Sequence, residues 1–217
     1  MELVSITLAR LTALIQFQEW DPLGKTLTLE ALAKLGGRFS FAKRPTKLED
    51  VDFQKGIEFI EGSFGDLRID KIAVFLNGIV IDTRSSTEDS ERVLSEILAL
   101  IHEAFGAKIK PARQTFASHI VFRSGMRLSS LNPVLPKIAE VLTEQSSADL
   151  RHPFTFEPTA VLFNIDSSQV KIAPQMFSIE RRADIPFAEN TYFSGAPLRT
   201  KEHIELLKRF ESAITAQ

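Results

Sequence analysis

Residues 67–83, LRIDKIAVFLNGIVIDT, decide which kind of fold this chain adopts. Two runs rich in β-branched residues flank Asn77 and Gly78. An Asn-Gly pair between such runs is typical of a two-residue hairpin loop, because a type I′ turn needs positive φ at both central residues. The stretch therefore predicts an antiparallel hairpin with a type I′ turn.

The same strands carry apolar side chains on both alternating faces, in residues 71–76 and 79–81, and residues 160–165 do the same. A sheet with one face in water should alternate apolar and polar residues. We therefore expect a cover on the second face. It can come from the other half of the chain, from the loop regions Trp20–Lys25 and Asp184–Pro197, or from a second copy of the protein.

The clearest helix is predicted over Thr87–Phe105, where apolar residues recur at spacings of three and four. Ser86 and Asp89 form a start that resembles a capping box. Gly106 follows as the expected helix stop.

Three further helices and six further strands complete the prediction. The helices cover Leu27–Leu35, ended by Gly36 and Gly37, a segment starting at Asn132 with Pro133 in its first turn, and a segment starting at Thr200 as N-cap. The strands are Val4–Gln18, Arg38–Ala42, Gly56–Phe64, Thr115–Arg123, Phe154–Ile165 and Gln175–Ala183.

Set in order, these elements read as two tandem β-α-β(n)-α units, residues 1–108 and 109–217, each with an antiparallel sheet and helices on one face. The fold class is therefore α+β. The order resembles the TATA-box-binding-protein-like architecture, in which two such units join into one sheet. The DNA-binding member of that class needs a basic concave face, and this chain is slightly acidic, so the resemblance implies no function here.

The composition limits which cellular compartment and which classes of partner we expect for this protein. The 217 residues carry a formal net charge of -2, which disfavours bulk binding to nucleic acid or to anionic lipid. The absence of cysteine excludes disulfides and thiolate metal sites and fits a reducing compartment. The start MELVSITLAR lacks the basic region of a secretory signal, and no apolar run approaches about 18 residues. We expect a soluble cytoplasmic protein without a membrane segment.

Signatures of catalysis and of cofactors are missing from the sequence. His102, His119, His152 and His203 have no metal-ligand spacing, and His102 and His203 are expected on solvated helix faces. GxSxG, Walker and GxGxxG motifs do not occur. We expect no metal site and no cofactor.

Candidate contact residues cluster in residues 178–200, SIERRADIPFAENTYFSGAPLRT. Strand alternation breaks at Arg181, which places one arginine on the apolar face, where it needs a carboxylate or an anionic ligand. The residues that follow form a long connection, and such connections are often functional. The candidates here are Glu180, Arg181, Arg182, Asn190 and Tyr192.

Arg44 is a further candidate, in a basic loop that precedes Glu49 and Asp50. Its guanidinium can offer two donors to phosphate or carboxylate. Alternatively, the loop is a solvated connection whose charges neutralise one another.

Taken together, the sequence predicts a non-catalytic binding or protein-interaction module that forms a homodimer. The alternative is a small enzyme that acts on an anionic substrate in a pocket between the halves, with Arg181 or Arg182 at the substrate. A nucleic-acid-binding protein is the third reading, which the net charge disfavours.

Overall fold

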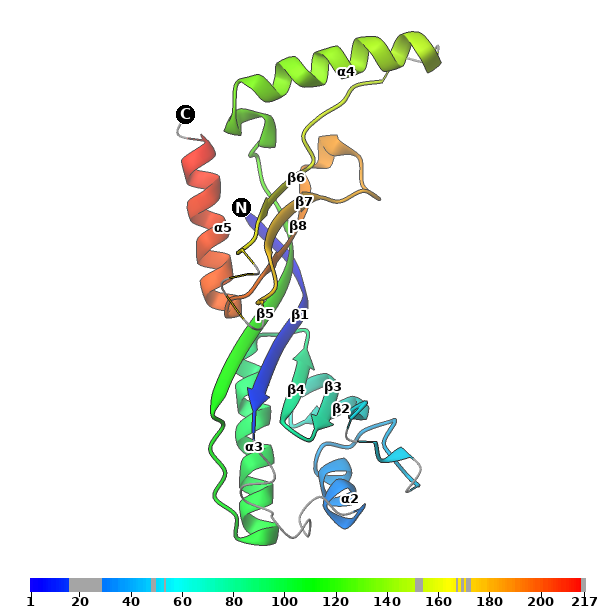
Figure 1. Cartoon of the computed structure of the whole chain (residues 1–217), viewed down its shortest axis with the longest axis vertical. Helices are drawn as coiled ribbons and strands as arrows, with labels where there is room; N and C mark the ends of the chain where they lie inside the picture. Colours follow the sequence, from blue (N-terminus) through cyan, green and yellow to red (C-terminus); the bar gives the residue numbers. More distant parts are fainter. Residues whose placement is uncertain are drawn as a thin grey trace. The chain divides into compact units, whose positions relative to one another are not determined.

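The computed structural model describes residues 1–15, 29–47, 50–52, 54–150, 154–166, 168, 170 and 173–215. These residues form a mixed α+β fold with four α-helices and one antiparallel sheet of eight strands (Figure 1). The strand order is β2-β3-β4-β1-β5-β8-β7-β6. No helix in the described ranges is long and apolar enough to cross a membrane.

The elements follow one another along the chain as β1 (Glu2–Leu14), α2 (Leu29–Arg38), β2 (Ile57–Phe64), β3 (Leu67–Phe75), β4 (Gly78–Thr83), α3 (Thr87–Phe105), β5 (Arg113–Arg123), η2 (Leu128–Leu131), α4 (Val134–Leu150), β6 (Ala160–Phe163), β7 (Phe177–Arg181), η4 (Phe187–Glu189), β8 (Thr191–Ala196) and α5 (Thr200–Thr215). The two η elements are short 3₁₀ helices.

The chain divides into two compact units. The α3 unit comprises residues 6–119 and 197–201, and the α4 unit comprises residues 1–5, 120–196 and 202–217. Each unit has a separate hydrophobic core. The expected division into 1–108 and 109–217 stays a prediction.

The predicted hairpin is present as β3 and β4, but its turn differs from the expected type I′. Phe75 pairs with Gly78, so the loop is residues 76–77, and neither Asn77 nor Gly78 is among the described residues with positive φ. A Cβ atom at Gly78 would lie 2.5 Å from the carbonyl oxygen of Ala13 in the neighbouring strand β1. Glycine is needed here because β1 approaches closely, and the turn does not require it.

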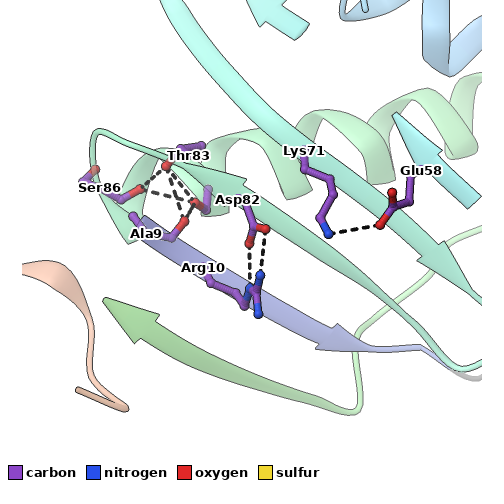
Figure 2. Close-up of polar contacts among 8 residues, drawn as sticks. Ala9, Arg10, Glu58, Lys71, Asp82, Thr83 and Ser86 are labelled. Atoms are coloured by element: carbon purple, nitrogen blue, oxygen red, sulfur yellow. Dashed lines mark hydrogen bonds and ion pairs between the residues drawn. The ribbon is translucent and has the colours of Figure 1, made fainter. Parts of the chain in front are cut away.

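Helix α3 has the predicted bounds. The Ser86 hydroxyl accepts the Asp89 N–H at 3.0 Å, and Gly106 ends the helix in a left-handed conformation with φ of 69°. In the first turn, the Ser90 hydroxyl donates to the carbonyl oxygen of Ala9 at 2.9 Å and lies 3.1 Å from the Thr83 hydroxyl. The Thr83 hydroxyl also donates to the carbonyl oxygen of Ser86 at 3.1 Å (Figure 2). This buried hydroxyl cluster ties the start of α3 to β1 and β4.

Two expectations for residues 27–42 are wrong. Helix α2 does not stop before Gly36 and Gly37 but continues to Arg38. A Cβ atom at Gly36 would lie 2.9 Å from Cδ of Arg44, so this buried glycine leaves room for the arginine stem. The strand over residues 38–42 does not form, because Ser40 has φ of 48° and breaks an extended chain. One bridge between Lys43 and Ile60 remains. Residues 27–28 lie outside the described residues, as do residues 16–18 of the first predicted strand and the loop 20–25.

The α4 unit contains a strand that the sequence does not predict. Strand β8 lies inside the segment 184–197 that reads as a connection. Its side chains are buried on both faces except for the half-buried Phe193, so no alternation of polar and apolar residues reveals it. The strand predicted over Phe154–Ile165 forms only at β6, and residues 154–159 are coil. The other strands and the helices α4 and α5 occur within a few residues of their predicted positions.

Candidate functional site

Arg181 lies on the apolar face of β7, as predicted. Its partner in the register with β8 is Tyr192, and Ile179 occupies the same face. Only 9% of Arg181 is exposed. A strand of five residues thus ends with a charged side chain inside the core of the α4 unit.

The guanidinium of Arg181 has three oxygen partners. Nη1 donates to the carbonyl oxygen of Phe187 at 2.9 Å and approaches Oδ1 of Asn190 at 3.5 Å. Nη2 lies 3.3 Å from Oε2 of Glu157. The Nε atom is buried and has no hydrogen-bond partner. The predicted carboxylate partner is therefore present, but it leaves one donor of a buried cation unused.

Two aromatic rings pack against the guanidinium of Arg181. Its central carbon lies 4.9 Å from the centre of the Phe187 ring and 5.1 Å from the centre of the Tyr192 ring. The hydroxyl of Tyr192 donates to the carbonyl oxygen of Met126 at 2.7 Å. Burial raises the pKa of Tyr192, and the Arg181 charge opposes this effect. Cation-π contacts and the hydrogen bond of the phenol fix the cation in one orientation.

Asn190 and Phe187 reach Arg181 through a short turn. The 3₁₀ helix η4 ends at Asn190, which adopts a left-handed conformation with φ of 49°, and its N–H donates to the carbonyl oxygen of Phe187 at 3.1 Å. Asparagine tolerates this backbone conformation better than most residues. The turn therefore presents two acceptors, one backbone and one side-chain oxygen, to the same guanidinium nitrogen.

A cavity of about 540 Å³ adjoins this cluster through Glu157. Helix α4 forms one wall with Glu140, Thr143 and Glu144, and the coil around Glu157 forms another. Arg127 adds one positive charge to a lining with three carboxylates. The Thr143 hydroxyl accepts the Phe156 N–H at 3.0 Å and holds the coil against the helix. The volume falls within the range of small-molecule sites.

The structure brings together three of the six predicted contact residues, Arg181, Asn190 and Tyr192. Glu180 points to the other face of β7, between Ala160 and Phe193. Arg182 forms a surface ion pair with Asp184, with an Nε–Oδ1 distance of 2.8 Å.

The sixth predicted contact residue, Arg44, is exposed and belongs to the α3 unit. Sequence reasoning missed Glu157 and Phe187. Phe187 lies in a segment without helical or strand periodicity. Glu157 lies in the part of the predicted strand Phe154–Ile165 that is coil in the structure, so the predicted pattern did not indicate its contact.

A serine and a histidine lie together in the core of the same unit as Arg181. The Ser194 hydroxyl is 2.8 Å from Nε2 of His203 and 2.5 Å from the carbonyl oxygen of Ser178. Both side chains are 0% exposed, which corrects the expectation of a solvated His203. The histidine faces inward because α5 packs this side of the helix onto β8. A fully enclosed pair cannot meet a substrate, so its role is structural.

A second charged cavity, of about 310 Å³, lies in the α3 unit near the start of α3. Two of its three arginines form ion pairs with aspartates of the lining, Arg84 with Asp70 at 2.6 Å and Arg92 with Asp89 at 3.0 Å. Opposite charges that satisfy each other at a surface contribute little and attract no ion.

Helix α4 exposes its apolar side. Val134, Ile138, Val141 and Leu142, here called the outer stripe, are 42–51% exposed. At 3.6 residues per turn they lie on the side of the helix opposite to Glu140 and Thr143, which line the cavity. Among the described residues, the exposed large apolar side chains other than Leu76 all belong to the α4 unit. Exposed apolar patches of this kind are common at interaction surfaces of other proteins.

The arrangement offers a buried, oriented cation beside a cavity and an apolar surface on the far side of α4. The described residues contain no group of three or more histidines, aspartates or glutamates that could hold a metal ion. No protein-family model matches the chain, and no curated protein is detectably similar to it in sequence.

Proposed function

We propose that this protein is a non-catalytic protein-interaction module that forms a homodimer through the outer stripe of α4. The observation that supports this proposal is the exposure of four large apolar side chains along one side of a seventeen-residue helix. A surface helix normally turns such a stripe toward a core. Here none of the described side chains of α4 is buried, and its half-buried residues Ala139 and Thr143 lie away from the stripe, so the apolar side is left for a partner.

The spacing of the stripe favours another helix as the partner. Val134, Ile138 and Val141 follow one another at intervals of four and three residues. This is the a/d pattern of helices that pack side by side with knobs in holes. Gln145 and Ala148 continue the same pattern toward the end of the helix.

The charges beside the stripe favour a second copy in the antiparallel orientation. Lys137 flanks the first half of the stripe, and Glu144 flanks the second half on the same side. In an antiparallel pair of α4 helices, Lys137 of one copy lies next to Glu144 of the other, twice by symmetry. A two-fold interface of this type is self-complementary, and a stable one covers about 800 Å² per partner.

Sedimentation velocity across the micromolar range tests the dimer. The wild-type chain is expected to sediment as a dimer, and Ile138→Glu as a monomer of 24.3 kDa. A charge in the middle of the stripe should raise the dissociation constant by at least about 30-fold, as loss of a central interface residue does. Leu162→Glu is the matched control, because Leu162 on β6 is equally exposed but lies outside the stripe.

Charge exchange tests the orientation of the two helices. Lys137→Glu should weaken the dimer by about 3-fold through like-charge contact with Glu144 of the other copy, and adding Glu144→Lys should restore it. A wild-type chain that stays monomeric at all concentrations refutes the dimer. Equal effects of Ile138→Glu and Leu162→Glu refute this surface.

We further propose that the chain is a tandem pair of β-α-β(n)-α units. The element order supports this, since β1-α2-β2-β3-β4-α3 is followed by β5-α4-β6-β7-β8-α5. The strand order supports it as well. From the centre of the sheet to either edge, the strands of each unit follow in the same sequence, first, fourth, third and second: β1-β4-β3-β2 in one direction and β5-β8-β7-β6 in the other. An experimental structure whose residues 1–108 and 109–217 do not superpose would refute the repeat. The cytoplasmic location likewise stays a prediction, which cell fractionation tests.

A further inference from the structure

The Nε and Nη2 atoms of an arginine form one edge of the guanidinium that can bind both oxygens of a carboxylate. Arg10 uses this edge fully, with Nε 2.7 Å from Oδ1 and Nη2 2.9 Å from Oδ2 of Asp82 (Figure 2). Arg182 does the same with Asp184, at 2.8 and 2.6 Å. In these two ion pairs, both donors on this edge of the guanidinium are therefore bonded to a carboxylate.

In Arg181, by comparison, only one of the two donors on this edge has a carboxylate oxygen nearby. Oε2 of Glu157 lies 3.3 Å from Nη2, and the buried Nε has no acceptor. A buried charged donor without a partner is unfavourable. A carboxylate that bonded to both nitrogens would remove this defect, and Glu157 does not do so.

We propose that Arg181 binds the carboxylate group of a small zwitterionic ligand in the α4 cavity, and that Glu157 occupies this position while the cavity holds no ligand. The ligand class follows from the lining. Glu140 and Glu144 lie one helical turn apart on the cavity side of α4 and favour an ammonium group. A free amino acid with a basic side chain has both charges and fits about 540 Å³.

The contacts of the two residues allow Glu157 to leave while Arg181 stays. The Glu157 side chain is 45% exposed and belongs to the coil before β6. The Arg181 side chain is 4% exposed, bonds to Phe187 and Asn190, and lies between two rings. Exchange therefore begins with a rotation of the half-exposed Glu157 side chain, since Arg181 itself does not line the cavity while Glu157 occupies this position.

This inference is independent of the proposed dimer. The cavity uses the side of α4 that carries Glu140 and Thr143, and the stripe lies on the opposite side. Glu144 borders both sides, so the tests of ligand binding use Glu140 instead. Binding is therefore expected in the Ile138→Glu variant as well as in the wild type.

Titration calorimetry with L-lysine tests the proposal with two variants that are expected to change the binding affinity in opposite directions. Glu140→Gln should weaken binding by about 10-fold, because it removes a partner of the ammonium group. Glu157→Gln should tighten binding by about 5-fold, because it removes the competitor for Arg181. If Glu157→Gln weakens binding as Glu140→Gln does, or leaves it unchanged, Glu157 is not a displaceable occupant and the proposal is overturned.

Two further measurements locate the carboxylate. The Arg181 Nε–H resonance should shift on addition of L-lysine, because this donor gains an acceptor. Cadaverine, which has both amines but no carboxylate, should bind at least about 10-fold more weakly and leave that resonance in place. Equal affinities for L-lysine and cadaverine, or an unshifted Nε–H resonance at saturation, would overturn the role of Arg181. These readouts do not depend on an Arg181 variant, whose fold the loss of a buried cation can disturb.

Discussion

Thr87 and Thr200 cap each other. The Thr87 N–H donates to the Thr200 hydroxyl at 3.0 Å, and the Thr200 N–H donates to the Thr87 hydroxyl at 2.9 Å. They are the first residues of α3 and α5, both are buried, and helix starts leave backbone donors without intrahelical partners. Each threonine therefore satisfies a donor of the other helix. The Arg199 guanidinium and the Glu91 carboxylate form an ion pair beside them.

Replacing either threonine with valine should lower the free energy of unfolding by about 1–2 kcal/mol, because a buried N–H loses its acceptor while the volume is kept. Thr87→Ser and Thr200→Ser keep the hydroxyl and should each cost about 0.5 kcal/mol or less. Urea denaturation measures both. A valine variant that loses no more stability than its serine counterpart would show that the reciprocal bonds contribute little.

Gly78→Ala should destabilise the chain by about 2 kcal/mol or more, because the new Cβ atom would lie 2.5 Å from the carbonyl oxygen of Ala13. Gly37→Ala is the control, since a Cβ atom at this helical residue would have no other atom within 4 Å. There alanine should stabilise by about 0.5–1 kcal/mol. Thermal unfolding of both variants checks the pair, and a neutral Gly78→Ala would contradict the close approach of β1.

The contribution of the first turn of α3 to the stability of the fold should depend on pH, because it includes the carboxyl group of Asp89. Burial alone would raise the pKa of this carboxyl group, but hydrogen bonds from Ser85, Ser86 and Arg92 outweigh it and hold the pKa below the ordinary 3.8. A carboxylate with a depressed folded pKa stabilises the fold above the unfolded pKa, and the contribution is lost as pH falls through the folded pKa. Asp89→Asn should therefore cost about 0.5–1 kcal/mol at neutral pH.

Denaturation of the wild type and of Asp89→Asn at neutral pH and below pH 3.8 measures this dependence. The difference between them should shrink at the lower pH. Glu103→Gln, in the last turn of the same helix, is the control and should be neutral or slightly stabilising, because a negative charge there opposes the helix dipole. If Asp89→Asn lowers the free energy of unfolding by the same amount at both pH values, the charge of Asp89 does not stabilise the start of the helix.

Two charge pairs, one between β1 and β4 and one between β2 and β3, should differ in strength. Asp82 is 5% exposed and binds Arg10 with both oxygens, whereas Lys71 and Glu58 form a more exposed pair at 3.1 Å (Figure 2). Asp82→Asn should cost about 1–2 kcal/mol, and Glu58→Gln about 0.5 kcal/mol or less. Urea denaturation at low and high salt compares them. Similar losses at both sites would mean that burial does not strengthen the Arg10–Asp82 pair.

The sequence by itself determined the features that depend on neighbours along the chain. Helix α3 has its predicted bounds because Ser86 and Gly106 act within one turn of its ends. The hairpin forms where two β-branched runs meet, and Arg181 faces the core because strand alternation is a local property.

Tertiary structure decided what distant segments do to one another. Gly78 is required by Ala13 of another strand, and strand β8 is buried on both faces, which removes the alternation that reveals a strand. His203 is enclosed because α5 packs onto β8. Glu157 meets Arg181 from a coil where the sequence predicts a strand, and the stripe of α4 faces outward although its pattern is that of a buried helix face. Periodicity identifies which side chains share a face, but only packing decides which face turns inward.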